Sequence, residues 1–126
     1  MSLPKLLPRR LVIRSFDSPD ATSSLETTRP ERNEEVFYYV EMTIGFEDEP
    51  ATNLFGITVA TPEALQAGET DDVILSDRAL LVVSEFNWNA IRSHLEGIVE
   101  HCPVDSWELA VAHLRLYFQW EYDGYR

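Results

Sequence analysis

The clearest pattern in the chain is an alternation of apolar and mixed positions over residues 36–46. One parity is apolar throughout: Val36, Tyr38, Val40, Met42, Ile44 and Phe46. The other parity is mixed: Phe37, Tyr39, Glu41, Thr43 and Gly45. A period of two is typical of a strand with one buried face. The pattern therefore predicts a strand that buries the first set.

A second strand is predicted over residues 53–61, with Phe55, Ile57 and Val59 facing inward. The connection between these two strands is the short acidic turn 47–50, so the two should form an antiparallel hairpin. Pro62 then starts a short helix that Gly68 closes.

Two more strands complete the predicted sheet. Residues 10–16 form a short apolar run after several prolines, which favours an edge strand. Residues 78–86 contain a run that is apolar on both parities, which favours a more central strand.

The stretch 17–33, which follows the first strand, is rich in Ser, Thr, Asp and Pro and shows no hydrophobic period. A loop of that length is unusual in a compact domain, which indicates a mobile or functional segment.

From residue 87 the apolar spacing becomes helical. Asn87 or Asn89 is the predicted cap of a helix whose apolar stripe is Trp88, Ile91, Leu95, Ile98, Val99 and Cys102. After Pro103, the pair Asp105 and Glu108 has the spacing of a capping box. It predicts a last helix with a second apolar stripe: Trp107, Ala110, Val111, Leu114, Tyr117 and Phe118.

The predicted fold is a single α+β domain over residues 1–126, with residues 1–9 as a loosely ordered N-terminal segment. It has an antiparallel four-stranded sheet, a short helix after the third strand, and two C-terminal helices packed on one face. We expect Trp88, Leu95, Val99, Leu114 and Phe118 to contribute to the shared core. The aromatic and acidic tail that follows should either dock on the domain or serve as an anchor for a partner.

The net charge of the chain favours some classes of binding partner over others. The chain has 10 basic and 22 acidic residues, a formal charge of −12. Four of the basic residues lie in the first 14 positions, which hold no acid, so the remainder carries −16. Such a domain repels nucleic acid and anionic lipid, and it attracts a basic protein. Taken alone, however, the charge fits any acidic soluble protein.

The expected location is the cytoplasm. No apolar run approaches the roughly 20 residues of a membrane span. The first ten residues lack the continuous apolar region of a signal peptide. Cys102 is a lone cysteine, so it cannot form an internal disulfide.

The titratable residues predict no catalytic site and no metal or cofactor site. His94, His101, His113 and Cys102 are the candidates, but they belong to no triad, metal or phosphate motif. His101 and Cys102 are neighbours on a helix and point about 100° apart, which is poor geometry for activating a thiol. The acidic loops lack the alternating oxygens and the glycine of a calcium loop.

The order of several short motifs resembles the Imm8 family of bacterial immunity proteins. These motifs are Ser18-Pro19-Asp20, the segment 55–65, Trp107-Glu108, Leu114-Arg115, and Trp120-Glu121-Tyr122 followed by Tyr125. The resemblance covers residues 11–125, although 21–33 has no pattern that aligns. It implies a non-catalytic protein that neutralises a toxin of a polymorphic toxin system.

Our leading hypothesis is therefore an immunity protein that covers a basic, nuclease-like toxin domain. The alternatives are an adaptor or structural subunit and, less well supported, a small hydrolase. The predicted partner-binding residues are the acidic loop residues and the tail: Glu47, Asp48, Glu49, Glu69, Asp71, Asp72, Trp120, Glu121, Tyr122 and Asp123. The exposed sheet face with Tyr39, Glu41 and Thr43 is the alternative surface.

Overall fold

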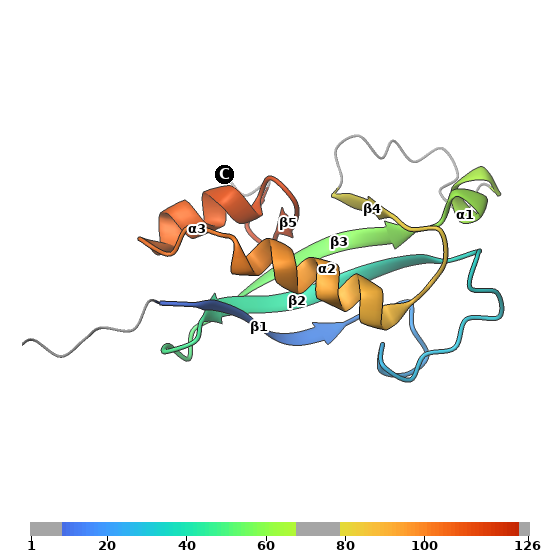
Figure 1. The fold of residues 1–126 in the computed structure, drawn as a ribbon, viewed down its shortest axis with the longest axis horizontal. Helices are drawn as coiled ribbons and strands as arrows, with labels where there is room; N and C mark the ends of the chain where they lie inside the picture. Colours follow the sequence, from blue (N-terminus) through green and yellow to red (C-terminus); the bar gives the residue numbers. More distant parts are fainter. Residues whose placement is uncertain (1–8, 68–78, 124–126) are drawn as a thin grey trace, which may run out of the picture.

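The protein has an α+β fold, as predicted, and the computed structural model describes residues 9–67 and 79–123. Helices α2 and α3 lie on the same face of the sheet (Figure 1). The elements in chain order are β1 (Leu11–Asp17), β2 (Phe37–Phe46), β3 (Asn53–Ala60), α1 (Pro62–Gln66), β4 (Leu80–Val82), α2 (Trp88–Glu100), α3 (Trp107–Leu114) and β5 (Gln119–Trp120).

The central hairpin forms with the predicted register. β2 pairs antiparallel with β3, and β1 pairs antiparallel with β2 at the edge of the sheet. Val40, Met42 and Ile44 are at most 1% exposed, which confirms the face assigned from the alternation. The mixed parity, including Tyr39 and Glu41, lies on the opposite face, which α2 and α3 leave uncovered (Figure 1).

The fourth strand differs from the prediction in direction and position. β4 has three residues, pairs with β3 in parallel, and stands at the end of the strand order rather than in its centre. The connection from Ala60 to Leu80 contains α1 and is long enough for the crossover that a parallel pair needs. The apolar run is misleading because Leu81 packs against the core whereas Val82 is 52% exposed.

The tail adds a fifth strand that the sequence pattern did not predict. β5 pairs antiparallel with β3, placing Trp120 opposite Phe55 and Gln119 opposite Gly56. β4 pairs with the other half of β3, from Thr58 to Ala60. Since β2 occupies the opposite edge of β3, β4 and β5 share the remaining one. The backbone of the tail is therefore docked on its own domain, one of the two predicted alternatives.

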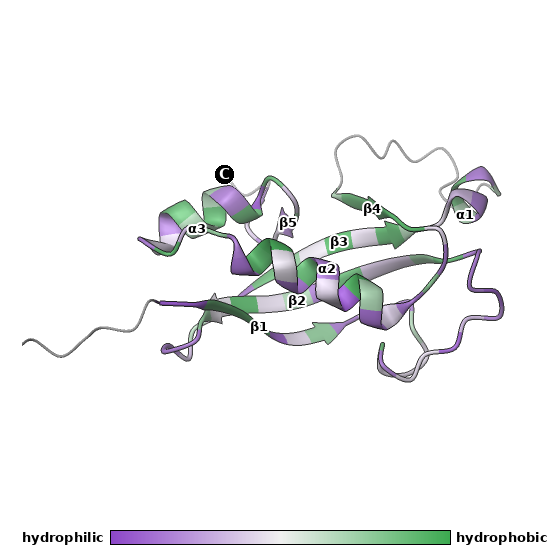
Figure 2. Ribbon diagram, in the orientation of Figure 1, coloured by the Kyte–Doolittle hydropathy of each residue, from purple (hydrophilic) through white to green (hydrophobic). Residues whose placement is uncertain are grey.

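The two long helices bury apolar residues against the sheet, and Figure 2 shows apolar and polar residues interspersed along both helices. Asn87 caps α2 by accepting a hydrogen bond from the Ala90 amide at 3.2 Å. The cap of α3 is Ser106, whose Oγ accepts from the Leu109 amide at 3.1 Å, so the assignment of Asp105 was wrong. Both residue types are good caps, so residue type alone could not decide between these two neighbouring positions.

The end of α3 also departs from the prediction. The helix stops at Leu114, so Tyr117 lies in the following turn and is 44% exposed instead of belonging to the buried stripe. The core prediction itself holds: the five expected contributors are all buried in one cluster, namely Trp88, Leu95, Val99, Leu114 and Phe118.

The long loop before β2 is packed against the rest of the domain. Leu25 is 3% exposed, the Phe86 amide donates to the Asn33 carbonyl at 2.7 Å, and Arg92 of α2 pairs with Glu26 at 3.0 Å. These contacts fix the loop beside the N-terminal end of α2. Within the described parts of the chain, no helix is long and apolar enough to cross a membrane.

Candidate partner-binding surface

The acidic hairpin turn between β2 and β3 is exposed, but two arginines hold it. Arg9 pairs with Asp48 at 3.4 Å and with Glu49 at 2.5 Å, and its guanidinium lies 3.6 Å from the centre of the Phe46 ring. Arg14 donates to three backbone carbonyls of the turn at 2.8–3.1 Å. Glu47 differs, because no described residue pairs with its carboxylate. Among the residues that the structure describes, the turn thus has one carboxylate without an ion-pair partner and two that are partly neutralised.

The tail forms a compact turn against the start of β3. Trp120 is half-buried, and its Nε1 donates to Asn53 Oδ1 at 3.2 Å. Glu121 exchanges two hydrogen bonds with Leu54, one from its amide and one to its carboxylate, each 2.9 Å long. Asp123 accepts from the Trp120 amide at 2.9 Å and pairs with Arg115 at 2.6 Å.

Among the described residues of the tail, Tyr122 is the most exposed aromatic side chain. It is 49% exposed, and its ring stands edge-on to Trp120 with centroids 5.0 Å apart. Trp120 therefore helps to hold the tail, and its role as a partner anchor stays a prediction.

The structure brings two of the three predicted acidic segments to the same end of the sheet. The hairpin turn immediately precedes β3, and the tail contacts Asn53 and Leu54 at the start of that strand. The third segment, with Glu69, Asp71 and Asp72, lies outside the described residues. Its convergence with the other two stays a prediction.

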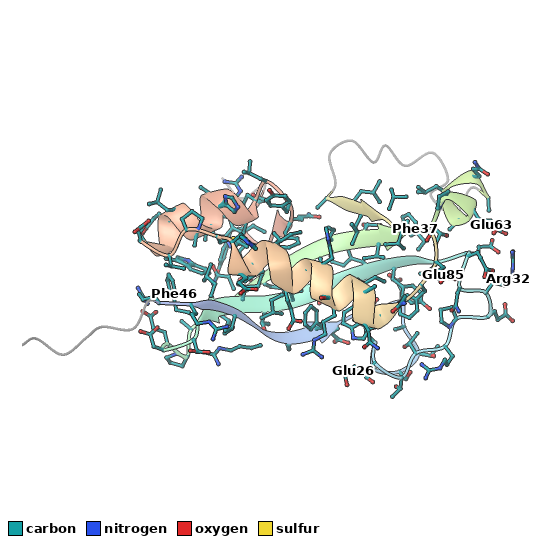
Figure 3. All side chains as sticks on the ribbon, viewed as in Figure 1. Glu26, Arg32, Phe37, Phe46, Glu63 and Glu85 are labelled. Atoms are coloured by element: carbon teal, nitrogen blue, oxygen red, sulfur yellow. The ribbon has the colours of Figure 1, made fainter. Side chains whose placement is uncertain are left out.

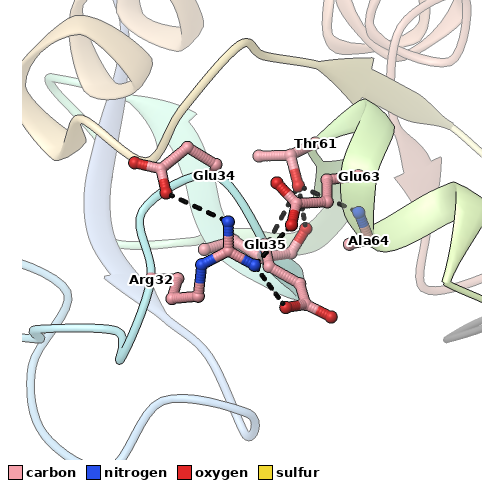
Figure 4. Close-up of polar contacts among 7 residues, drawn as sticks. Arg32, Glu34, Glu35, Thr61, Glu63 and Ala64 are labelled. Atoms are coloured by element: carbon pink, nitrogen blue, oxygen red, sulfur yellow. Dashed lines mark hydrogen bonds and ion pairs between the residues drawn. The ribbon is translucent and has the colours of Figure 1, made fainter.

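A further acidic cluster, which sequence reasoning missed, occupies the opposite end of β2. Arg32 lies among Glu34, Glu35 and Glu63, with ion-pair distances of 3.7 Å to Glu34 and 3.3 Å to Glu35 (Figure 4). The hydrogen bond to Glu63 is the main cause that raises the pKa of the Arg32 guanidinium above its usual range. Figure 3 shows this cluster near Phe37, with Phe46 at the far end of the strand.

The cluster forms because β2 and β3 are paired. Thr61 follows β3, accepts a hydrogen bond from the Val36 amide at 3.0 Å, and also caps α1. This contact brings the first turn of α1, with Glu63, beside the acidic residues that precede β2. The acidic residues are visible in the sequence, but they come together only because Val36 contacts Thr61, 25 residues later in the chain.

Two of the candidate catalytic side chains, those of His101 and Cys102, each contact a different backbone carbonyl of α2. The Nδ1 atom of His101 lies 2.7 Å from the Gly97 carbonyl oxygen, and the Cys102 thiol donates to the Ile98 carbonyl at 3.4 Å. Burial raises the pKa of the Cys102 thiol to about 11, which is opposite to what a nucleophile requires. In the part of the chain that the structure describes, no group of three or more His, Cys, Asp or Glu side chains could hold a metal ion.

Comparison with known proteins identifies a family. The family model described as Immunity protein 8 matches residues 11–125, which is nearly the whole chain. No curated protein and no solved structure matches.

Proposed function

The chain belongs to the Immunity protein 8 family, and on that premise we propose that it binds and neutralises a basic toxin domain in the cytoplasm. The family implies an immunity protein whose partner is a toxin protein and which acts as a non-enzymatic inhibitor. The match over residues 11–125 is the single observation that carries the proposal. A nuclease domain is the toxin class that we favour, because binding to phosphates requires a basic surface.

Charge supports the basic partner. The chain carries −12, and acidic groups gather at both ends of β2, in the hairpin turn and around Arg32. A negative surface raises the rate of encounter with a positive cleft and has less effect on the lifetime of the complex. Fast association benefits an inhibitor that has to capture a toxin before the toxin acts.

We place the contact at the hairpin end of the sheet, the end to which the turn and the tail both belong. Among the described residues, no ion pair neutralises the carboxylate of Glu47, and Glu121 and Tyr122 are exposed on the tail. Glu69, Asp71 and Asp72 remain part of the proposed surface. The Arg32 cluster is the competing acidic surface, and it retains more acid than base.

The experiment measures binding of the toxin domain encoded by the neighbouring gene. Co-expression should restore growth, and stopped-flow association should slow about tenfold or more between about 0.05 M and about 0.5 M salt. Glu47→Gln and Glu34→Gln remove the same charge from opposite ends of the sheet. We expect Glu47→Gln to slow association more.

The results separate the parts of the proposal. If the toxin domain does not bind and growth is not restored, the inhibitor assignment is wrong. An association rate that does not change with salt would contradict the proposal that the partner is basic. A larger effect of Glu34→Gln would move the contact to the Arg32 cluster.

A further inference from the structure

The exposed apolar side chains of this protein are concentrated in one short segment. Among the described residues, five large hydrophobic side chains are exposed, and four of them lie between residues 109 and 122. They are Leu109 (52%), Leu116 (74%), Tyr117 (44%) and Tyr122 (49%). Single exposed apolar residues are ordinary, whereas a group of them marks an interaction surface.

The helical geometry places Leu109 on the side of α3 that faces away from the core, and Leu116 is exposed in the turn after the helix. α3 buries Ala110, Val111 and Leu114, and Phe118 continues that face beyond the helix end. At about 100° per residue, Leu109 and Ala112 lie roughly opposite this face. Leu116 lies in the turn that follows the helix and is 74% exposed. We call these three residues the α3 outer stripe. α3 is thus apolar on both faces and is coloured as hydrophobic over much of its length (Figure 2).

The tail extends this surface at the C-terminal end of the helix. Arg115, which precedes Leu116, pairs with Asp123 at 2.6 Å and lies 5.6 Å from the Trp120 ring. These contacts hold the tail, with Tyr122, beside the end of α3. The rings of His113 and Tyr117 are in contact, with centroids 5.6 Å apart and planes tilted by 48°. The apolar surface is therefore built on fixed elements.

We propose that the α3 outer stripe is the apolar anchor for the toxin domain, an inference that rests on the proposed function. The charges around the stripe determine the kind of partner. Asp105, Glu108 and Glu121 are exposed around it, and Arg115 is already neutralised by Asp123. A second copy of this chain would bring these carboxylates against each other. A toxin domain with an apolar patch framed by Lys and Arg complements both features.

The test compares leucine-to-serine variants with a matched control. Leu109→Ser and Leu116→Ser should each weaken binding of the neighbouring gene's toxin domain by about tenfold or more, through faster dissociation. Val82→Ser is the control, because Val82 has the same 52% exposure as Leu109 but lies on β4. It should bind like the wild type. Hydrogen exchange of the unmodified complex should show protection over residues 109–117, whether or not the variants fold.

Each alternative outcome is decisive. If the wild type binds the toxin but the stripe variants match Val82→Ser, or if residues 109–117 gain no protection, the anchor lies elsewhere and the immunity function stands. If the wild type does not bind the toxin, the function and the anchor both fail. If the wild type is a dimer that Leu116→Ser dissociates, the stripe joins copies of this chain and the proposed occupant is wrong.

Discussion

The same substitution on opposite faces of α3 should separate folding from binding. Leu114 is fully buried, whereas Leu109 is 52% exposed five positions earlier in the same helix. We predict that Leu114→Ala destabilises the protein strongly and that Leu109→Ala has little effect on stability. The pair controls for residue type, for helix propensity and for the element that is changed.

The magnitudes follow from burial. Leu→Ala removes three carbon groups, each of which contributes about 0.8 kcal/mol when buried, so the transfer part is about 2.4 kcal/mol. The cavity beside Phe118 adds to this, and we expect a total loss of about 3–4 kcal/mol for Leu114→Ala. Leu109→Ala loses only part of the transfer energy and gains slightly in helix propensity, so its cost should stay below about 1 kcal/mol.

Urea unfolding followed by circular dichroism measures both values. With total stabilities typically between about 5 and 15 kcal/mol, both variants should be folded in buffer. The two unfolding slopes should match that of the wild type, so that shifts of the midpoint report stability. If the two losses agree within about 0.5 kcal/mol, or if Leu109→Ala costs more, the orientation of α3 is wrong, and the outer stripe with it.

Further substitutions test other parts of the fold. A Cβ at Gly45 would come within 2.3 Å of the Ala51 carbonyl oxygen, whereas one at Gly97 meets no atom within 4 Å. Gly45→Ala should therefore destabilise by about 1–3 kcal/mol, and Gly97→Ala, inside α2, should stabilise by about 0.5–1 kcal/mol; equal thermal midpoints would contradict this. Burial raises the folded-state pKa of Cys102 to about 11, above that of the unfolded thiol. The stability associated with this shift is present below about pH 8.5 and is lost as the pH rises toward 11. Cys102→Ala should reduce that loss when the free energy of unfolding is measured against pH. If the slope of this free energy with pH is the same in the variant, the thiol is not buried as described. Trp120→Phe keeps an aromatic ring but loses the hydrogen bond to Asn53, so tail amides should exchange faster and toxin binding should weaken with them. Weaker binding with unchanged exchange would make Trp120 a direct contact.

Local patterns predicted the elements that local contacts determine. The alternation over β2 fixed its buried face, and the short turn fixed the hairpin with β3. The stripe of α2 likewise matched its buried residues. In each case the period of the sequence and the packing surface coincide, so no distant contact was needed for the prediction.

Non-local pairing limited the rest of the prediction. The direction of β4 depends on a crossover, and β5 depends on a sheet edge supplied by β3, more than 60 residues earlier. Similarly, the sequence marked the hairpin acids as exposed, but it gave no sign that Arg9 would neutralise two of them. The Arg32 cluster required the contact between Thr61 and Val36.

The outer face of α3 shows how an amphipathic template can hide a functional surface. The template assigned Tyr117 to the core stripe and gave no role to Leu109 or Leu116. In the structure, the core takes Ala110, Val111 and Leu114, and the two leucines remain outside. A polar residue at either position would leave the buried face unchanged and would suit water better. Folding alone therefore does not account for these leucines, whereas a partner that covers them does.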